Sequence, residues 1–136
     1  MMSPATVSRA GVRRAAIRLG LLALVLIHTS APLAANPVPA DEASVARGAV
    51  SYQRYCTECH GRDGRAQMDI ISDATDLTDP EAYYNGSGEQ DIYNSIALGA
   101  GVGMPPWREQ LKSEEAVWDL VNFIRSLWSE DQRASF

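Results

Sequence analysis

Two cysteines and a histidine stand together in one short motif of this chain, Cys56-Thr57-Glu58-Cys59-His60. The chain has no other cysteine among its 136 residues. A C-x-x-C-H run is typical of c-type haem attachment, in which each thiol adds across one vinyl group of the porphyrin. Two intervening residues on a tight turn place both sulfurs on one side, and the adjacent imidazole then lies beneath the iron. We therefore predict one covalent haem c per chain, attached through Cys56 and Cys59 and ligated by His60.

Two other chemistries use similar residues. A thiol–disulfide redox motif follows a strand in a thioredoxin-like βαβ context, whereas the pattern of residues 46–55 is typical of a helix. A structural zinc site normally closes with four ligands, and no Cys or His follows His60 to complete a set of three. The motif and its context favour haem attachment over both.

The sixth iron position decides between a catalyst and an electron carrier, because an open position admits a substrate. The candidates for a second ligand after His60 are Met68 and Met104. Met68 follows His60 by only eight residues, which leaves little chain to pass round the macrocycle to its far face. Met104 lies 44 residues beyond His60, in a loop that Pro105 and Pro106 stiffen. We therefore predict that Met104 is the distal ligand and that Met68 has a core or surface role.

The first 35 residues have the anatomy of a secretory signal peptide. Their basic region has four arginines and no acidic residue: Arg9, Arg13, Arg14 and Arg18. A short apolar segment follows at 19–27, and small residues offer a cleavage site near Ala35, with a cut after Ala40 as the alternative. A spanning helix needs ~20 apolar residues, so an uncleaved anchor is the less favoured interpretation. Export predicts a periplasmic protein.

The remaining chain is expected to form one small domain. We expect residues 36–44, which contain two prolines, to be a disordered lead-in, 45–128 to be the folded domain, and 129–136 to be a C-terminal tail. Gly48 and Tyr52 share one face of a helix expected over 45–55. A glycine on that face predicts that another helix crosses closely there.

Capping signals predict the later helices. Asp79-Pro80 is a helix start, and Ser87 with Gln90 three residues later has the pattern of a capping box. Ser113 is expected to cap a longer C-terminal helix. That helix has an apolar stripe at helical spacing, which is typical of an ordinary core. The residues of the stripe are Val117, Leu120, Val121, Ile124 and Leu127.

Taken together, these motifs resemble those of class I c-type cytochromes, the mono-haem cytochrome c superfamily, over residues 45–127. The resemblance implies an all-α cytochrome c fold, with a few short helices and long loops wrapped around one haem and with His60 and Met104 as axial ligands. It also implies that the N- and C-terminal helices cross where Gly48 and Tyr52 meet Leu120 and Phe123. The matching residues are Gly48, Tyr52, Cys56 to Gly61, Asp63-Gly64, Asp76 to Asp79, Ile92 to Ile96, Gly99, Met104 to Trp107 and Asp119 to Ile124.

Two residues depart from the family pattern. Related bacterial domains often have glycine where this chain has Ala66, and proline where it has Thr75. A backbone carbonyl in that proline region commonly accepts a hydrogen bond from the proximal imidazole. A threonine carbonyl serves equally, in a less stiff loop.

Charge sets the expected partners. The chain has 12 basic and 17 acidic residues, and four of the basic ones lie in the leader, so the mature part carries 8 − 17 = −9. This charge argues against nucleic acid and anionic membranes as partners and suits a basic docking face. We expect a monomeric one-electron carrier, not an enzyme, that shuttles between a dehydrogenase or reductase and a terminal acceptor. Membrane contact is expected only through a membrane-bound partner or an uncleaved anchor.

Two other functions remain open at the level of sequence. One is a dedicated haem subunit of a quinoprotein dehydrogenase. The other is a haem enzyme or gas sensor with an open iron site, which would require that Met104 does not bind the iron.

Overall fold

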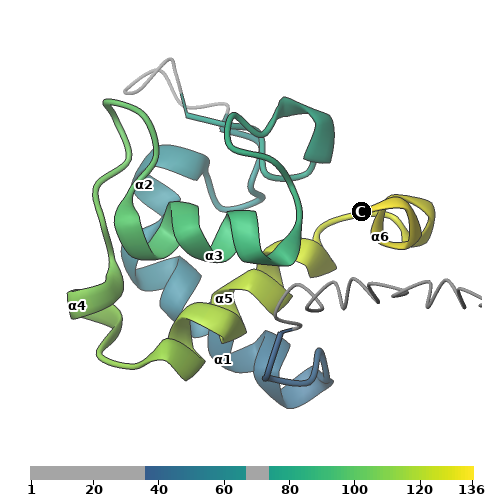
Figure 1. Ribbon diagram of the computed structural model, residues 1–136, viewed down its shortest axis with the longest axis horizontal. Helices are drawn as coiled ribbons and strands as arrows, with labels where there is room; N and C mark the ends of the chain where they lie inside the picture. Colours follow the sequence, from purple (N-terminus) through teal and green to yellow (C-terminus); the bar gives the residue numbers. More distant parts are fainter. Residues whose placement is uncertain (1–35, 67–73) are drawn as a thin grey trace, which may run out of the picture. The chain divides into compact units, whose positions relative to one another are not determined.

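The computed structural model describes residues 36–66 and 74–136, so the expected signal peptide and Met68 lie outside the described residues. The described residues form helices and loops, and their only β-type pairing is an isolated bridge between Ala100 and Met104. This confirms the all-α prediction (Figure 1). The elements are α1 Glu42–Tyr55, α2 Thr57–His60, the 3-10 helix η1 Pro80–Ala82, α3 Glu89–Leu98, α4 Arg108–Leu111, α5 Glu114–Ser126 and α6 Glu130–Ser135.

Helices α1 and α5 cross at Gly48, as the resemblance implied. A Cβ atom at Gly48 would lie 2.1 Å from the Asp119 carbonyl oxygen and 2.7 Å from the Phe123 Cβ. No side chain fits there, so the glycine permits the close approach of the two backbones. One turn further along α1, the Tyr52 ring packs on the Phe123 ring with a centroid distance of 4.9 Å.

The core lies where α1 and α3 pack against α5. Val117 and Val121 of the apolar stripe are fully buried, and Leu120 is nearly so. On the side of α3, the Tyr93 ring stacks on the Trp118 ring with a centroid distance of 4.4 Å. The stripe therefore has the ordinary core role that its spacing predicted.

The expected disordered lead-in at 36–44 is wrong. Helix α1 already begins at Glu42, and the side chain of Asp41 caps it by accepting from the Ser44 N–H at 2.8 Å. Upstream of this cap, Val38 packs against the core and the Asn36 amide bonds to Asn122. The prediction from composition failed because the groups that hold this segment belong to α5, more than 80 residues away in the sequence.

Two further expectations need correction. Gly88 is the N-cap of α3 without a side-chain bond, so the capping box of Ser87 and Gln90 does not form. Residues 129–136 are not a plain tail, because Ser129 and Gln132 form a capping box at the start of α6. The expected caps at Asp79 and Ser113 are both present.

Candidate haem-binding site

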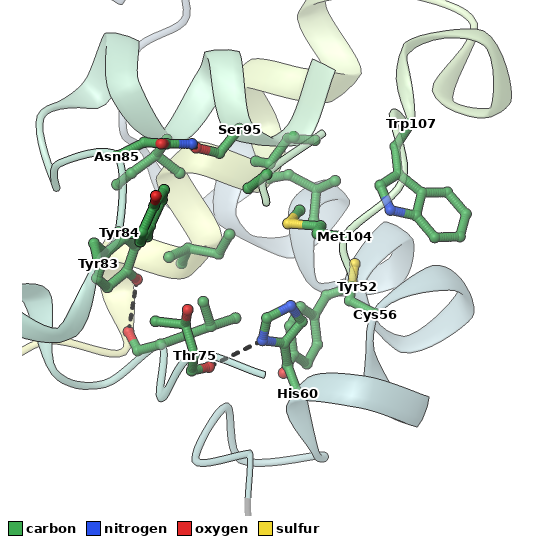
Figure 2. Close-up of a pocket in the computed structure, with 16 residues that line it drawn as sticks. Tyr52, Cys56, His60, Thr75, Tyr83, Tyr84, Asn85, Ser95, Met104 and Trp107 are labelled. Atoms are coloured by element: carbon green, nitrogen blue, oxygen red, sulfur yellow. Dashed lines mark hydrogen bonds between the residues drawn. The ribbon is translucent and has the colours of Figure 1, made fainter. Parts of the chain in front are cut away.

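A largely apolar pocket brings most of the predicted site residues together (Figure 2). The space between its lining residues is about 630 Å³, a figure that includes open solvent at its mouth. Cys56, His60 and Met104 line the pocket. Its other lining residues are Tyr52, Thr75, Leu77, Tyr83, Tyr84, Asn85, Ile92, Ser95, Ile96, Ala100, Trp107, Leu120 and Ile124.

The cysteine motif forms the short helix α2 directly after α1. Cys56 caps the end of α1 through its backbone N–H, which donates to the Tyr52 carbonyl at 2.9 Å. His60 then donates its own N–H back to the Cys56 carbonyl at 2.9 Å. Both thiols are free and partly buried. Cys56 lines the pocket, whereas Cys59 is not among the lining residues.

Burial raises the pKa of the Cys56 thiol to about 12, and the neighbouring Cys59 adds a smaller effect in the same direction. Reactive cysteines of redox motifs show the opposite behaviour, because a lowered pKa makes them thiolates at neutral pH. The surroundings of Cys56 therefore do not favour the thiol–disulfide alternative.

The proximal candidate, His60, is held by one backbone bond. Its Nδ1 lies 3.0 Å from the Thr75 carbonyl oxygen. A carbonyl oxygen only accepts, so Nδ1 carries the proton and Nε2 keeps a free lone pair. Figure 2 shows Nε2 turned toward the interior of the pocket. Burial lowers the pKa of His60 and the Thr75 bond raises it by less, so the neutral imidazole is favoured.

Met104 reaches the pocket from a loop that folds back on α3. Its backbone exchanges two hydrogen bonds with Ala100, at 3.0 and 3.2 Å, and the Trp107 N–H donates to the Ile96 carbonyl at 2.9 Å. Gly99 permits this return: its φ is +88°, and a Cβ there would lie 2.8 Å from the Met104 carbonyl oxygen. The loop presents the thioether to the same pocket as the His60 imidazole (Figure 2).

Polar residues that no sequence motif indicated lie at the other end of the pocket. Tyr84, Asn85 and Ser95 lie away from Cys56 (Figure 2). The Asn85 Nδ2 donates to the Ser95 Oγ at 3.1 Å. By local sequence alone, residues Asn85 to Gly88 indicate only a break between helices. Because Ser95 lies on α3 and Asn85 in the preceding loop, only their spatial proximity identifies them as a group.

The sequence of this chain matches one known protein family. The family described as cytochrome c oxidase, cbb3-type, subunit III matches residues 43–124. The chain belongs to this family. Its membership confirms the c-type cytochrome that the motifs resemble, and haem c follows from the family.

Two known proteins are similar to this member of the cbb3-type subunit III family. The cbb3-type cytochrome c oxidase subunit CcoP of Rhodobacter capsulatus is 36% identical over 95 residues, which cover 65% of this chain and 31% of that protein. The chain thus spans about a third of the length of that relative. Cytochrome CL of the marine methylotroph Methylophaga aminisulfidivorans is 20% identical, with a TM-score of 0.53 over 71% of this chain and 70% of that one. This second likeness confirms the cytochrome c fold.

The residues present fit the haem c of this family. The pocket offers a neutral imidazole with a free lone pair, a thioether and a thiol, and mostly apolar side chains form its walls. No group of three or more His, Cys, Asp or Glu side chains in the described ranges converges as a metal site. Within those same ranges, every helix is too short or too polar to cross a membrane.

Proposed function

We propose that this chain is a one-electron transfer domain that carries a single haem c. The haem would be attached through Cys56 and Cys59, with His60 and Met104 as its two axial ligands. One observation carries the proposal: the imidazole and the thioether, 44 residues apart in the sequence, line the same apolar pocket. When bound there, the haem supplies one-electron chemistry between Fe(II) and Fe(III).

The protein would orient the axial ligands and keep other molecules from the iron. The Thr75 carbonyl fixes the ring of His60 and the tautomer that leaves Nε2 free to bind iron. Met104 would occupy the sixth position, so exogenous ligands and substrates are kept from the iron, and a methionine ligand raises the reduction potential. Tyr84, Asn85 and Ser95 give the pocket a polar end, which suits the two carboxylate groups of a haem.

The cellular setting follows from the leader and the charge. Export would place the domain in the periplasm, where its net charge of −9 favours redox partners with a basic docking face. The relative named as a subunit of a cbb3-type oxidase supports a membrane-bound redox complex as the electron acceptor. The domain would then act as a monomeric electron carrier for such a complex and would not itself catalyse a reaction.

Spectroscopy of the purified holoprotein tests this proposal. A redox titration should follow a single one-electron step, and the oxidised protein should show the weak charge-transfer band of an iron–thioether bond at the red edge of the visible spectrum. Met104→Ala should abolish this band and open the reduced iron to carbon monoxide. Met68→Leu is the matched control and should change neither property.

Two results would contradict the proposal. A wild-type protein that binds carbon monoxide readily would indicate an open-site haem enzyme or gas sensor. Loss of the band in Met68→Leu alone would transfer the distal role to Met68.

A further inference from the structure

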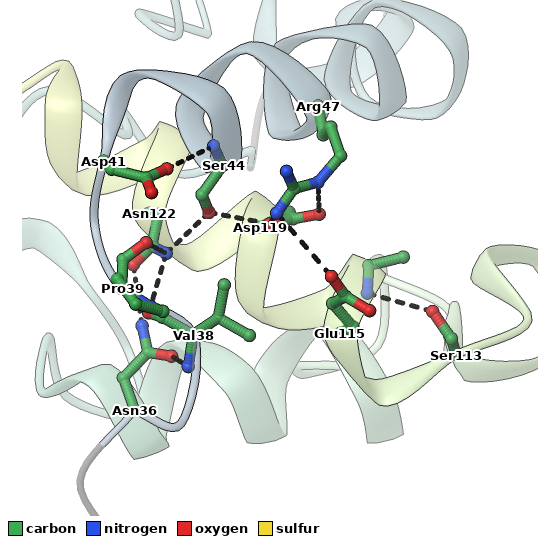
Figure 3. Close-up of polar contacts among 11 residues, drawn as sticks. Asn36, Val38, Pro39, Asp41, Ser44, Arg47, Ser113, Glu115, Asp119 and Asn122 are labelled. Atoms are coloured by element: carbon green, nitrogen blue, oxygen red, sulfur yellow. Dashed lines mark hydrogen bonds and ion pairs between the residues drawn. The ribbon is translucent and has the colours of Figure 1, made fainter.

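Asn122, on α5, is only 2% exposed. Both the nitrogen and the oxygen of its side-chain amide are hydrogen-bonded. Its Nδ2 donates to the Ser44 Oγ at 2.8 Å and lies near the carbonyl oxygens of Val38 and Pro39, at 3.2 and 3.3 Å (Figure 3). Since carbonyl oxygens only accept, the orientation of the amide is fixed. Its Oδ1 in turn accepts from the Asn36 Nδ2 at 2.6 Å.

The same network continues into the crossing of α1 and α5. The Ser44 Oγ donates to the Asp119 Oδ1 at 2.6 Å. The Arg47 guanidinium donates to both oxygens of that carboxylate, at 2.7 and 2.8 Å. Within the described residues, no buried side-chain nitrogen or oxygen lacks a partner. Loss of any member would leave a buried polar group unpaired, which is unfavourable.

Residues 36–39 form the outer end of this network, and we call them the N-terminal strap. The Val38 N–H donates to the Asn36 Oδ1 at 2.9 Å, which folds the strap on itself. The Pro39 carbonyl accepts from the Asp41 N–H at 2.9 Å, which joins the strap to the cap of α1. The strap thus supplies partners for Asn122 and apolar contact through Val38.

This arrangement distinguishes the two cleavage positions that the sequence offers. A cut after Ala40 would remove the strap, whereas a cut after Ala35 would leave it complete. We propose that the leader is removed by hydrolysis of the Ala35–Asn36 bond and that the strap is part of the mature domain. Water adds to the Ala35 carbonyl carbon, the C–N bond breaks, and the amino group leaves on Asn36. The inference rests on the export that the proposed function includes.

The mature N-terminus is the direct test. The full chain is expressed in a host that exports and matures c-type cytochromes, and the periplasmic protein is analysed by intact mass and N-terminal sequencing. We expect a chain that begins at Asn36. A chain that begins at Asp41, or one that retains its leader, would overturn the inference. The optical spectrum of the same sample reports covalent haem, so failure of the proposed function is distinguished from failure of the cleavage assignment.

Paired variants at the two positions sharpen the test, because leader peptidases require a small residue just before the cut. Ala35→Leu should slow processing, so that precursor accumulates. Ala40→Leu, at an exposed position after the strap, should be processed like wild type. Normal processing of Ala35→Leu, or precursor accumulation in Ala40→Leu, would contradict the assignment.

The contribution of the strap to folding is measured separately on the holoprotein. Asn36→Ala removes the partner of the Asn122 oxygen and should lower the thermal midpoint by roughly 5 °C. Pro37→Ala is the matched control, because Pro37 is exposed in the same segment, and its midpoint should stay close to wild type. Equal midpoints for the two variants would show that the strap does not stabilise the domain.

Discussion

The Nδ1 of His60 donates to the carbonyl oxygen of Thr75 across 3.0 Å, and Thr75 stands where related domains often have proline. The bond therefore depends on the backbone carbonyl at this position and does not require a proline there. It links the end of α2 to a loop 15 residues further along the chain. The haem-binding imidazole would be oriented by this loop.

We predict that Thr75→Gly weakens this bond, because glycine adds backbone freedom at the position of the accepting carbonyl. Exchange of the His60 Nδ1–H with solvent, measured by NMR on the reduced holoprotein, should become several-fold faster. Thr78→Gly is the control in the same loop, because the Thr78 side chain and N–H bond to Asp76 instead. Equal exchange in the two variants would show that the Thr75 carbonyl does not hold the ring.

Covalent attachment should depend on both cysteines. We predict that Cys56→Ala and Cys59→Ala each leave one thioether and that the double variant leaves none. Acid–acetone extraction should release no haem from wild-type protein and all of it from the double variant. Free haem in the organic phase from wild-type protein would exclude a c-type attachment.

The position of Met104 should depend on Gly99. A Cβ at this positive φ would press on the Met104 carbonyl, so Gly99→Ala should displace the loop and weaken the iron–thioether band. Gly103→Ala lies in the same loop with no atom within 4 Å of the added Cβ, and it should leave the band unchanged. A normal band in Gly99→Ala would mean that the position of the Met104 thioether does not depend on the turn at Gly99.

The helix crossing should be intolerant of any side chain at Gly48. Alanine normally favours a helix over glycine by about 1 kcal/mol, but here its Cβ would overlap the Asp119 carbonyl. We therefore expect Gly48→Ala to lower the free energy of unfolding by about 1–3 kcal/mol, as overpacking does. Denaturant titration of the holoprotein measures this, with Val50→Ala at an exposed position of α1 as the control. A stabilised Gly48→Ala would refute the close crossing.

Electron transfer to the partner should slow as salt rises. The net charge of −9 that residues 36–136 carry attracts a basic face, and the screening length is only about 8 Å at physiological ionic strength. Glu58→Lys, at an exposed position in the cysteine motif, should lower the association rate more than it raises the dissociation rate. The variant and wild-type rates should converge at high salt. A wild-type rate that increases with salt would indicate an acidic partner.

The haem attachment motif and the helix crossing can both be predicted from local sequence. The spacing of Cys56, Cys59 and His60 predicts haem attachment because both thiols must reach one face of a porphyrin from a single turn. Family membership confirms a c-type cytochrome, from which haem c follows. Gly48 predicted the helix crossing for a similar reason, since only a residue without a side chain tolerates so close a backbone. These signals depend on covalent geometry or on one residue type, so they need no knowledge of distant partners.

The tertiary structure decided which distant groups meet. Composition marked residues 36–44 as disordered, yet the Asn122 amide, on a helix far along the chain, satisfies two carbonyls of that segment. The polar pair of Asn85 and Ser95 likewise exists only because α3 packs beside the loop that precedes it. Hydrogen-bond partners and buried surface come from segments far apart in the sequence, so only the packed chain determines which local preferences prevail.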